Sequence, residues 1–194
     1  MTSTHIEHTF YINLDRCVAA RDRMETMLSE YALSPHERFP GTASGYGYIG
    51  ATISHLQALK EAKARGYRNI LIFEDDFEFL HSKQDVDARL TEFFASELAA
   101  DYDVLMFGYS VNRGELTTVS GIERALDAQA FSGYLVSERY YDALIEVIEE
   151  GLTHLIATHK HWDYMVDQIV KRSQPHTRWY YITPRPGKQT NREF

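Results

Sequence analysis

Residues 70–76 of the chain read Ile70-Leu71-Ile72-Phe73-Glu74-Asp75-Asp76. Four branched or aromatic apolar residues run directly into three consecutive carboxylates. A continuous apolar run of this kind predicts a β-strand that is buried on both faces, as in a parallel sheet covered by helices. In open α/β sheets, ligands bind just beyond the carboxyl ends of such strands. The stretch therefore predicts an α/β fold and a candidate site at its acidic end.

The three carboxylates, Glu74, Asp75 and Asp76, repel one another and require a counter-charge. Mg²⁺ and Mn²⁺ prefer oxygen ligands, and either ion would suit a site shared by carboxylate and phosphate oxygens. We therefore expect a divalent cation at the end of this strand. The alternative is a solvated strand end that caps the following segment.

The segments before this strand alternate between strand and helix patterns. Residues 18–31 have apolar side chains at i, i+3, i+4 and i+7, the spacing of an amphipathic helix, and Asp15 is its expected N-cap. The expected ranges are 9–14 and 37–39 for strands, and 18–31 and 49–65 for helices. This alternation favours an α/β sandwich with a largely parallel sheet.

The rest of the chain continues in the same way, and nothing in it indicates a repeat or a linker. We expect strands at 77–80, 104–108, 116–119, 128–136 and 179–182, and helices within 85–99, from 137 to a stop at Gly151, and at 162–169. Residues 184–194 are expected to form an extended tail. The prediction is therefore one domain over residues 1–194.

Composition limits the classes of function. The apolar share of 44% and the charged share of 25% are those of an ordinary soluble globular protein. A formal net charge of −8 argues against a nucleic-acid or anionic-membrane partner, because both require a concentrated basic surface. A single cysteine, Cys17, excludes an internal disulfide. Without a signal-peptide pattern or an apolar run of about 20 residues, we expect a cytoplasmic protein with no integral membrane segment.

Three further groups of residues carry possible chemistry near the start of the chain. Asn13 and Arg16 follow the first strand, and Arg23 lies on the helix after it. Guanidinium groups beside a helix N-terminus could hold a base, ribose or phosphate, although solvated Arg–Asp pairs explain them equally well. Ser54 and His55 lie near the start of the second helix, where a lone histidine is more often a hydrogen-bonded structural residue than a catalyst. Residues 41–50 contain four glycines, which indicates either close backbone approach to a ligand or a plain surface connection.

The late segment His159-Lys160-His161-Trp162-Asp163 is followed by Asp167. Its alternating His and Asp side chains could supply metal ligands, but a polar loop that enters an amphipathic helix accounts for them better. Asp163, beside Trp162, is a candidate general base whose pKa would be raised by partial burial.

Taken together, five segments resemble glycosyltransferase family 25, the family of lipopolysaccharide-biosynthesis galactosyltransferases and collagen galactosyltransferases. They occur in the family's order: FYINLDRCVAARDRM, GYIGATISHLQALKEAKARGYRNILIFEDD, DVLMFG, AFSGYLVS and HWDYMVD. The similarity runs from about Phe10 to Gln189. Two departures are Ala51, where a cysteine is usual, and the chain end at Phe194, where an acidic segment would be expected.

The resemblance implies a GT-A fold, a Rossmann-type α/β/α sandwich that binds a nucleotide sugar. It implies Mn²⁺ (or Mg²⁺) on Glu74 and Asp76, bridging the diphosphate of a UDP-sugar. It implies Asp163 as the base in a single inverting transfer of galactose or glucose to a hydroxyl of a glycan or lipopolysaccharide-type acceptor. The residues it assigns to the donor are Asn13, Arg16, Arg23, Ser54, His55, Asp75 and Gln189.

Two other functions fit the sequence. One is a catalytically degenerate homologue that binds a nucleotide sugar or a partner without turnover. The other is a metal-dependent phosphohydrolase that uses the acids at the strand end. The sequence indicates no oligomeric state.

Overall fold

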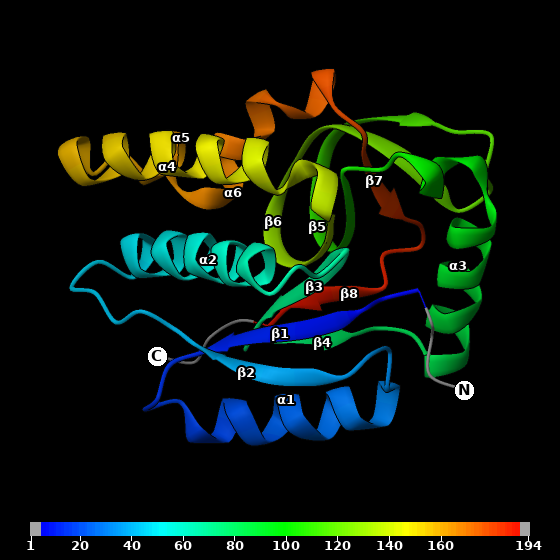
Figure 1. The fold of residues 1–194 in the computed structure, drawn as a ribbon, viewed down its shortest axis with the longest axis horizontal. Coiled ribbons are helices and arrows are strands. Elements are labelled where there is room, and N and C mark those ends of the chain that lie inside the picture. Colours follow the sequence, from blue (N-terminus) through cyan, green and yellow to red (C-terminus); the bar gives the residue numbers. More distant parts are fainter. Residues whose placement is uncertain (1–4, 191–194) are drawn as a thin grey trace.

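An eight-stranded sheet runs through the centre of the protein, with helices on both of its faces, in the computed structural model, which describes residues 5–190 (Figure 1). The strand order is β2-β1-β3-β6-β7-β5-β8-β4. The strands are β1 (His8–Asn13), β2 (His36–Pro40), β3 (Asn69–Glu74), β4 (Phe77–Phe79), β5 (Val104–Leu116), β6 (Ile122–Ser137), β7 (Trp179–Ile182) and β8 (Gly187–Gln189).

The helices are grouped by face. In Figure 1, α2 and α4 lie on one side of the sheet and α1 lies on the other. The α-helices are α1 (Val18–Tyr31), α2 (Gly47–Ala64), α3 (Lys83–Ala95), α4 (Tyr141–Thr158), α5 (His161–Tyr164) and α6 (Val166–Ile169). The 3₁₀ helices are η1 (Glu97–Ala100), η2 (Glu138–Tyr140), η3 (Val170–Arg172) and η4 (Gln174–His176).

Most of the strands point the same way. β1, β2 and β3 are parallel, β6 runs against β3, and β5 runs against β6, so β5 returns to the first direction. β7 and β8 are parallel to β5, and β4 opposes β8. The sheet also curls, because the start of β6 pairs with β7 while its end pairs with β3. The mainly parallel α/β/α sandwich expected from the sequence is confirmed.

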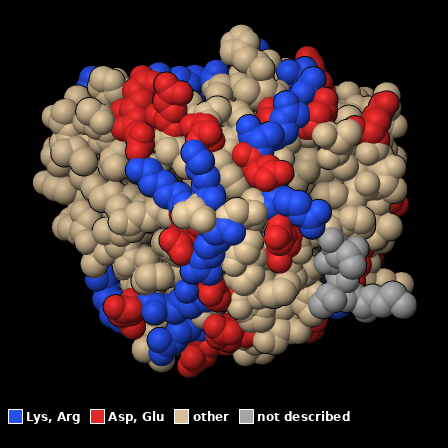
Figure 2. All heavy atoms as spheres, in the orientation of Figure 1, with Lys and Arg blue, Asp and Glu red and all other residues tan. Residues whose placement is uncertain are grey.

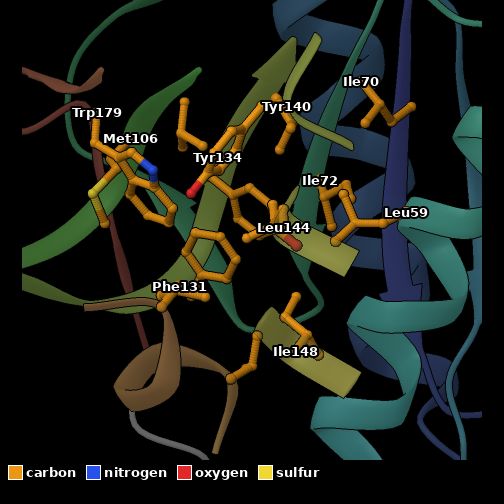
Figure 3. Close-up of a cluster of buried hydrophobic side chains, with 14 of the residues drawn as sticks. Leu59, Ile70, Ile72, Met106, Phe131, Tyr134, Tyr140, Leu144, Ile148 and Trp179 are labelled. Atoms are coloured by element: carbon orange, nitrogen blue, oxygen red, sulfur yellow. The ribbon is translucent and has the colours of Figure 1, made fainter. Parts of the chain in front are cut away.

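The apolar residues of β3 supply both cores of the sandwich. Ile70 and Ile72 pack into the cluster beneath α2 and α4, whereas Leu71 and Phe73 pack into the cluster beneath α1 and α3. Figure 3 shows part of the first cluster, where the labelled Leu59 and Leu144 come from the helices and Tyr134 and Trp179 from the strands. Alternate side chains of a strand point to opposite faces, so four consecutive apolar residues serve two cores.

Several element predictions need correction. The short strand expected at 116–119 is wrong, because β5 ends at Leu116 and residues 117–121 form the turn of a long antiparallel hairpin between β5 and β6. Gly151 does not end its helix; it lies inside α4, where a Cβ atom would meet Ile169 Cγ1 at 2.6 Å, so the glycine allows α4 to pack against α6. The single late helix is two short helices, α5 and α6.

Two predictions near the chain ends also differ from the structure. The N-cap of α1 is Cys17, and Asp15 instead pairs with Arg38. The segment expected as an extended tail contains β8, which pairs with β4 and β5 inside the sheet. The last four residues of that segment, 191–194, lie outside the described residues.

Acidic and basic side chains are interspersed on the face shown in Figure 2, and no large patch of one sign separates from the other. Across residues 5–190, no helix has the length and apolar character to span a membrane.

Candidate active site

A cavity of about 710 Å³ opens at the carboxyl ends of β1 and β3. One wall carries the acids that follow β3, and another is made by the start of α1. The third wall is the glycine-containing loop with the first turns of α2. Of the residues expected at a site, the cavity is lined by Arg16, Arg23, Ser54, His55, Glu74, Asp75 and Asp76.

Asn13 is buried at the end of β1 and connects three segments. Its side-chain amide donates to Asp75 Oδ2 at 2.7 Å and to the Cys17 carbonyl at 3.0 Å. Its Oδ1 accepts from Arg38 Nε at 3.0 Å. Asn13 is not among the lining residues, so it acts on the cavity by orienting Asp75 and the start of α1.

Glu74 is oriented by a buried histidine. His55 Nε2 lies 3.2 Å from Glu74 Oε1, and His55 Nδ1 lies 2.7 Å from the Tyr134 hydroxyl. A carboxylate only accepts, so Nε2 carries the proton that faces Glu74, and in the neutral imidazole Nδ1 accepts from Tyr134. Burial, with the nearby charge of Glu74, raises the pKa of Tyr134 well above its usual value, which keeps that hydroxyl protonated.

Gln189, on β8, joins two of the acids. Its Nε2 donates to Glu74 Oε2 and to Asp76 Oδ2, at 3.0 Å each. The next residue reinforces this contact, because Thr190 donates its N–H and its hydroxyl to the Asp76 carbonyl at 2.7 and 2.8 Å. The Glu74 and Asp76 carboxylates therefore converge on one donor group.

Positive charge faces these acids from α1. Arg16 and Arg23 are exposed and line the cavity, and the guanidinium of Arg23 lies 3.4 Å from the Asp75 carbonyl. Within the part of the chain that the structure describes, neither forms an ion pair with a carboxylate. Their charges thus face the cavity and could contact an anionic ligand.

The loop before α2 is tied to the helix by Ser54. Its hydroxyl donates to the Gly50 carbonyl at 2.7 Å and accepts from the Thr42 amide at 2.8 Å. At Gly50, a Cβ atom would stand 2.4 Å from the Thr42 carbonyl oxygen. The glycine there allows close approach between two backbone segments that both line the cavity.

Asp163 lies outside the set of lining residues. Its side chain is exposed on α5, so the partial burial expected for it is wrong. The less exposed carboxylate of this region is Asp167, which is half-buried and whose Oδ2 accepts from the Ala130 amide at 3.3 Å. Burial raises the pKa of Asp167, the Ala130 and Gln168 hydrogen bonds oppose that shift, and the charge of Glu74 adds to it.

Three contributing residues have no motif that marks them as functional. Arg38 holds Asn13 and Asp15, and it comes from β2, the neighbour of β1. Tyr134 holds His55 from β6, 79 residues away in sequence. Thr42 belongs to the glycine-containing loop, and only the composition of that loop indicated that it could approach a ligand.

A divalent cation fits the donor set at Glu74 and Asp76. In residues 5–190, no group of three or more His, Cys, Asp or Glu side chains is arranged to hold a metal. The site thus lacks an all-protein cage, and an ion there would need ligand oxygens from a substrate or water. Mg²⁺ binds in this way, through one or two carboxylates together with phosphate oxygens.

Comparison with solved structures shows the class of fold. The chain is similar to a glycosyltransferase involved in the glycosylation of the major capsid of PBCV-1, with a TM-score of 0.55 and 9% identity over 92% of this chain and 82% of that chain. It is also similar to mannose-1-phosphate geranyltransferase from Thermus thermophilus, with a TM-score of 0.46 and 10% identity over 92% of this chain and 74% of that chain. A197 from STIV gives a TM-score of 0.47 and 11% identity over 97% of this chain and 87% of that chain. No protein-family model and no curated protein sequence matches.

The chain therefore shares its α/β/α sandwich fold with the PBCV-1 glycosyltransferase, and the narrower GT-A assignment stays a prediction. Within that class, the resemblance to family 25 rests on the sequence segments alone and stays a prediction.

Proposed function

We propose that the protein is a metal-dependent glycosyltransferase of family 25 that transfers galactose or glucose from a UDP-sugar to a glycan hydroxyl, with inversion. One observation carries the proposal. Glu74 and Asp76 face the same cavity as Arg16 and Arg23, at the carboxyl ends of parallel strands. A diphosphate with a bound cation requires this combination, since the ion contacts carboxylates and the remaining phosphate charge contacts guanidinium groups.

Each side chain then has a defined task. Glu74 and Asp76 would hold Mn²⁺ or Mg²⁺, which as a Lewis acid stabilises the leaving diphosphate. Arg16 and Arg23 would neutralise the phosphate oxygens that face α1, and Ser54 keeps the loop over the donor in place. His55 and Asn13 orient Glu74 and Asp75 from behind.

Asp163 is the proposed base that takes the proton from the acceptor hydroxyl. It is exposed on a short helix that follows α4, where an acceptor can reach it from solvent. Asp167 is less accessible to an acceptor than Asp163, because its side chain is half-buried and its Oδ2 accepts from Ala130 and Gln168. A positioned base typically accelerates a proton transfer by about 10²–10⁴-fold.

Thermal unfolding with UDP, with and without Mn²⁺, tests the donor site. At a hundredfold excess over Kd, UDP should stabilise the protein by about 2.7 kcal/mol, which is roughly 5–10 °C for a chain of this length. Asp76→Asn should lose the Mn²⁺-dependent part of this shift. Asp142→Asn, an exposed change on α4 away from the cavity, is the matched control and should behave as the wild type.

An unchanged UDP response in Asp76→Asn, or one independent of metal, would show that the donor-site assignment is wrong. Transfer from UDP-galactose or UDP-glucose then tests turnover, and Asp163→Asn should reduce it by about 10²-fold or more without changing UDP binding. UDP binding without any turnover in the wild type would identify the degenerate, binding-only homologue instead.

A further inference from the structure

Five aromatic rings, four from exposed residues and one from the half-buried Tyr48, form a surface beside the cavity, here called the aromatic shelf. It consists of Tyr46, Tyr48, His159, His161 and Trp162. The rings come from two distant segments, the start of α2 and the residues just after α4. Figure 1 shows the N-terminal end of α2 and the C-terminal end of α4 on the same side of the molecule, at the left of the view.

The rings contact one another across the two segments. The Tyr48 and His161 rings are stacked with centroids 5.1 Å apart, and the Tyr46 and His159 centroids are 4.5 Å apart. The Tyr48 hydroxyl lies 3.2 Å from His159 Nδ1. Trp162 extends the shelf with its ring 5.0 Å from that of His161. The surface is therefore built by tertiary contacts and is not a chance run of neighbouring residues.

The shelf leaves large apolar rings in water. Trp162 is 61% exposed and Tyr46 is 51% exposed. The other tryptophan, Trp179, is fully buried. An exposed aromatic group with polar rims is typical of a binding surface.

The shelf is continuous with the cavity. Tyr46 is the N-cap of α2, between Ser44 and Gly47, which both line the cavity. On the other side, Trp162 directly precedes Asp163. The two segments are also joined behind the shelf, where the Val166 amide donates to Thr52 Oγ1 at 3.2 Å. A molecule lying on these rings would thus meet both the cavity and the proposed base.

We propose that the aromatic shelf binds a pyranose unit of the acceptor glycan. The inference rests on the proposed function and adds where the acceptor lies. A pyranose ring has a face of C–H groups that packs on aromatic rings and an edge of hydroxyls that exchange hydrogen bonds. The shelf offers both counterparts, since its rings carry Tyr hydroxyls and His nitrogens at their edges.

The size of the shelf also favours a sugar over a second protein. From their exposed fractions, Trp162 and Tyr46 together present on the order of 250 Å² of accessible surface. A stable dimer buries about 800 Å² per partner, so these two residues would supply less than half of that area.

Tryptophan fluorescence provides the test, because the chain has only Trp162 and Trp179 and they differ so strongly in exposure. Acrylamide should quench Trp162 selectively. Lactose, maltose and chitobiose serve as probes, and at least one should protect Trp162 from quenching at millimolar concentration.

Ligand-detected NMR then measures the affinity of each variant for the protecting disaccharide. This method also works for variants that lack Trp162. Trp162→Ala and Tyr46→Ala should each weaken disaccharide binding roughly fivefold to tenfold, while UDP binding in the presence of Mn²⁺ stays within about twofold of the wild type. Leu116→Ala, which removes an 87% exposed apolar side chain from β5, should change neither.

Absence of protection by every probe, or unchanged disaccharide binding in Trp162→Ala, would overturn the shelf assignment while UDP binding persists. Quenching that depends on protein concentration would overturn it in favour of contact between copies of the chain. Failure of UDP binding in the wild type would instead refute the proposed function, so the two failures are distinguishable.

Discussion

The close backbone contact at Gly50 predicts the effect of Gly50→Ala on the free energy of unfolding. A loss of stability is expected if the loop is packed in place, and a gain if the loop is a loose surface connection. In the structure, a Cβ atom at Gly50 would lie 2.4 Å from the Thr42 carbonyl oxygen, about 1 Å closer than ordinary contact. The neighbour is backbone, so it cannot rotate away. If the loop is held in place, Gly50→Ala forces it outward and breaks the 2.8 Å hydrogen bond from the Thr42 amide to Ser54.

The expected magnitude follows from three effects. Overpacking costs about 1–3 kcal/mol, and losing the hydrogen bond costs about 1 kcal/mol. Against these, alanine is favoured over glycine inside a helix by about 1 kcal/mol. The free energy of unfolding should therefore fall by about 1–3 kcal/mol, which lowers Tm by roughly 2–12 °C. If the loop were a loose surface connection, the helix effect alone would make Gly50→Ala more stable than the wild type.

Urea unfolding of the variant and the wild type measures the difference. Gly47→Ala is the matched control, because Gly47 lies in the same helix and lines the same cavity, but a Cβ atom there would have no neighbour within 4 Å. It should be neutral or slightly stabilising. Equal or greater stability of Gly50→Ala relative to Gly47→Ala would refute the packed-loop argument, provided that the urea m-value is unchanged.

Two further predictions concern buried polar groups. Asn13→Ala should lower the free energy of unfolding by about 2–4 kcal/mol in urea unfolding, because Asp75 and Arg38 both lose a buried partner; a loss no larger than that of the exposed Asn112→Ala would contradict it. For Asp167, a raised pKa means that the folded state holds the proton more tightly, so its contribution is most favourable at low pH and is lost as pH rises through the folded pKa. Urea unfolding from about pH 4 to 7 should therefore show the wild type losing stability relative to Asp167→Asn, and a difference independent of pH would contradict the burial argument.

Most of the helices and strands that were predicted correctly have a clear apolar pattern in the local sequence. The helix at 18–31 and the strand at 179–182 have the predicted bounds, because their apolar periodicity and burial agree. The predictions failed where tertiary contacts override local chemistry. Gly151 continues a helix because a neighbouring helix requires its small size, and the polar hairpin of β5 and β6 is held by pairing between strands.

The candidate site was predicted to a similar extent, and for a related reason. Residues that follow β1 and β3 were expected together because parallel strands end at one edge of the sheet. Ser54 and His55, on α2, were assigned to the donor only by the resemblance to family 25. Residues that only orient another site residue have no pattern in the local sequence that marks them. Tyr134 reaches His55 from β6, and Arg38 reaches Asn13 from β2, so both depend on strand order, which the local pattern does not give.

The three acids at the end of β3, Glu74, Asp75 and Asp76, are held by different parts of the chain. Asp75 is held by Asn13 from β1, whereas Glu74 is held by His55 from α2. Gln189 contacts Glu74 and Asp76 together, and it belongs to β8, near the end of the described residues. The Gln189 amide therefore ties together two carboxylates that both line the cavity, which is where the proposed cation and diphosphate would bind.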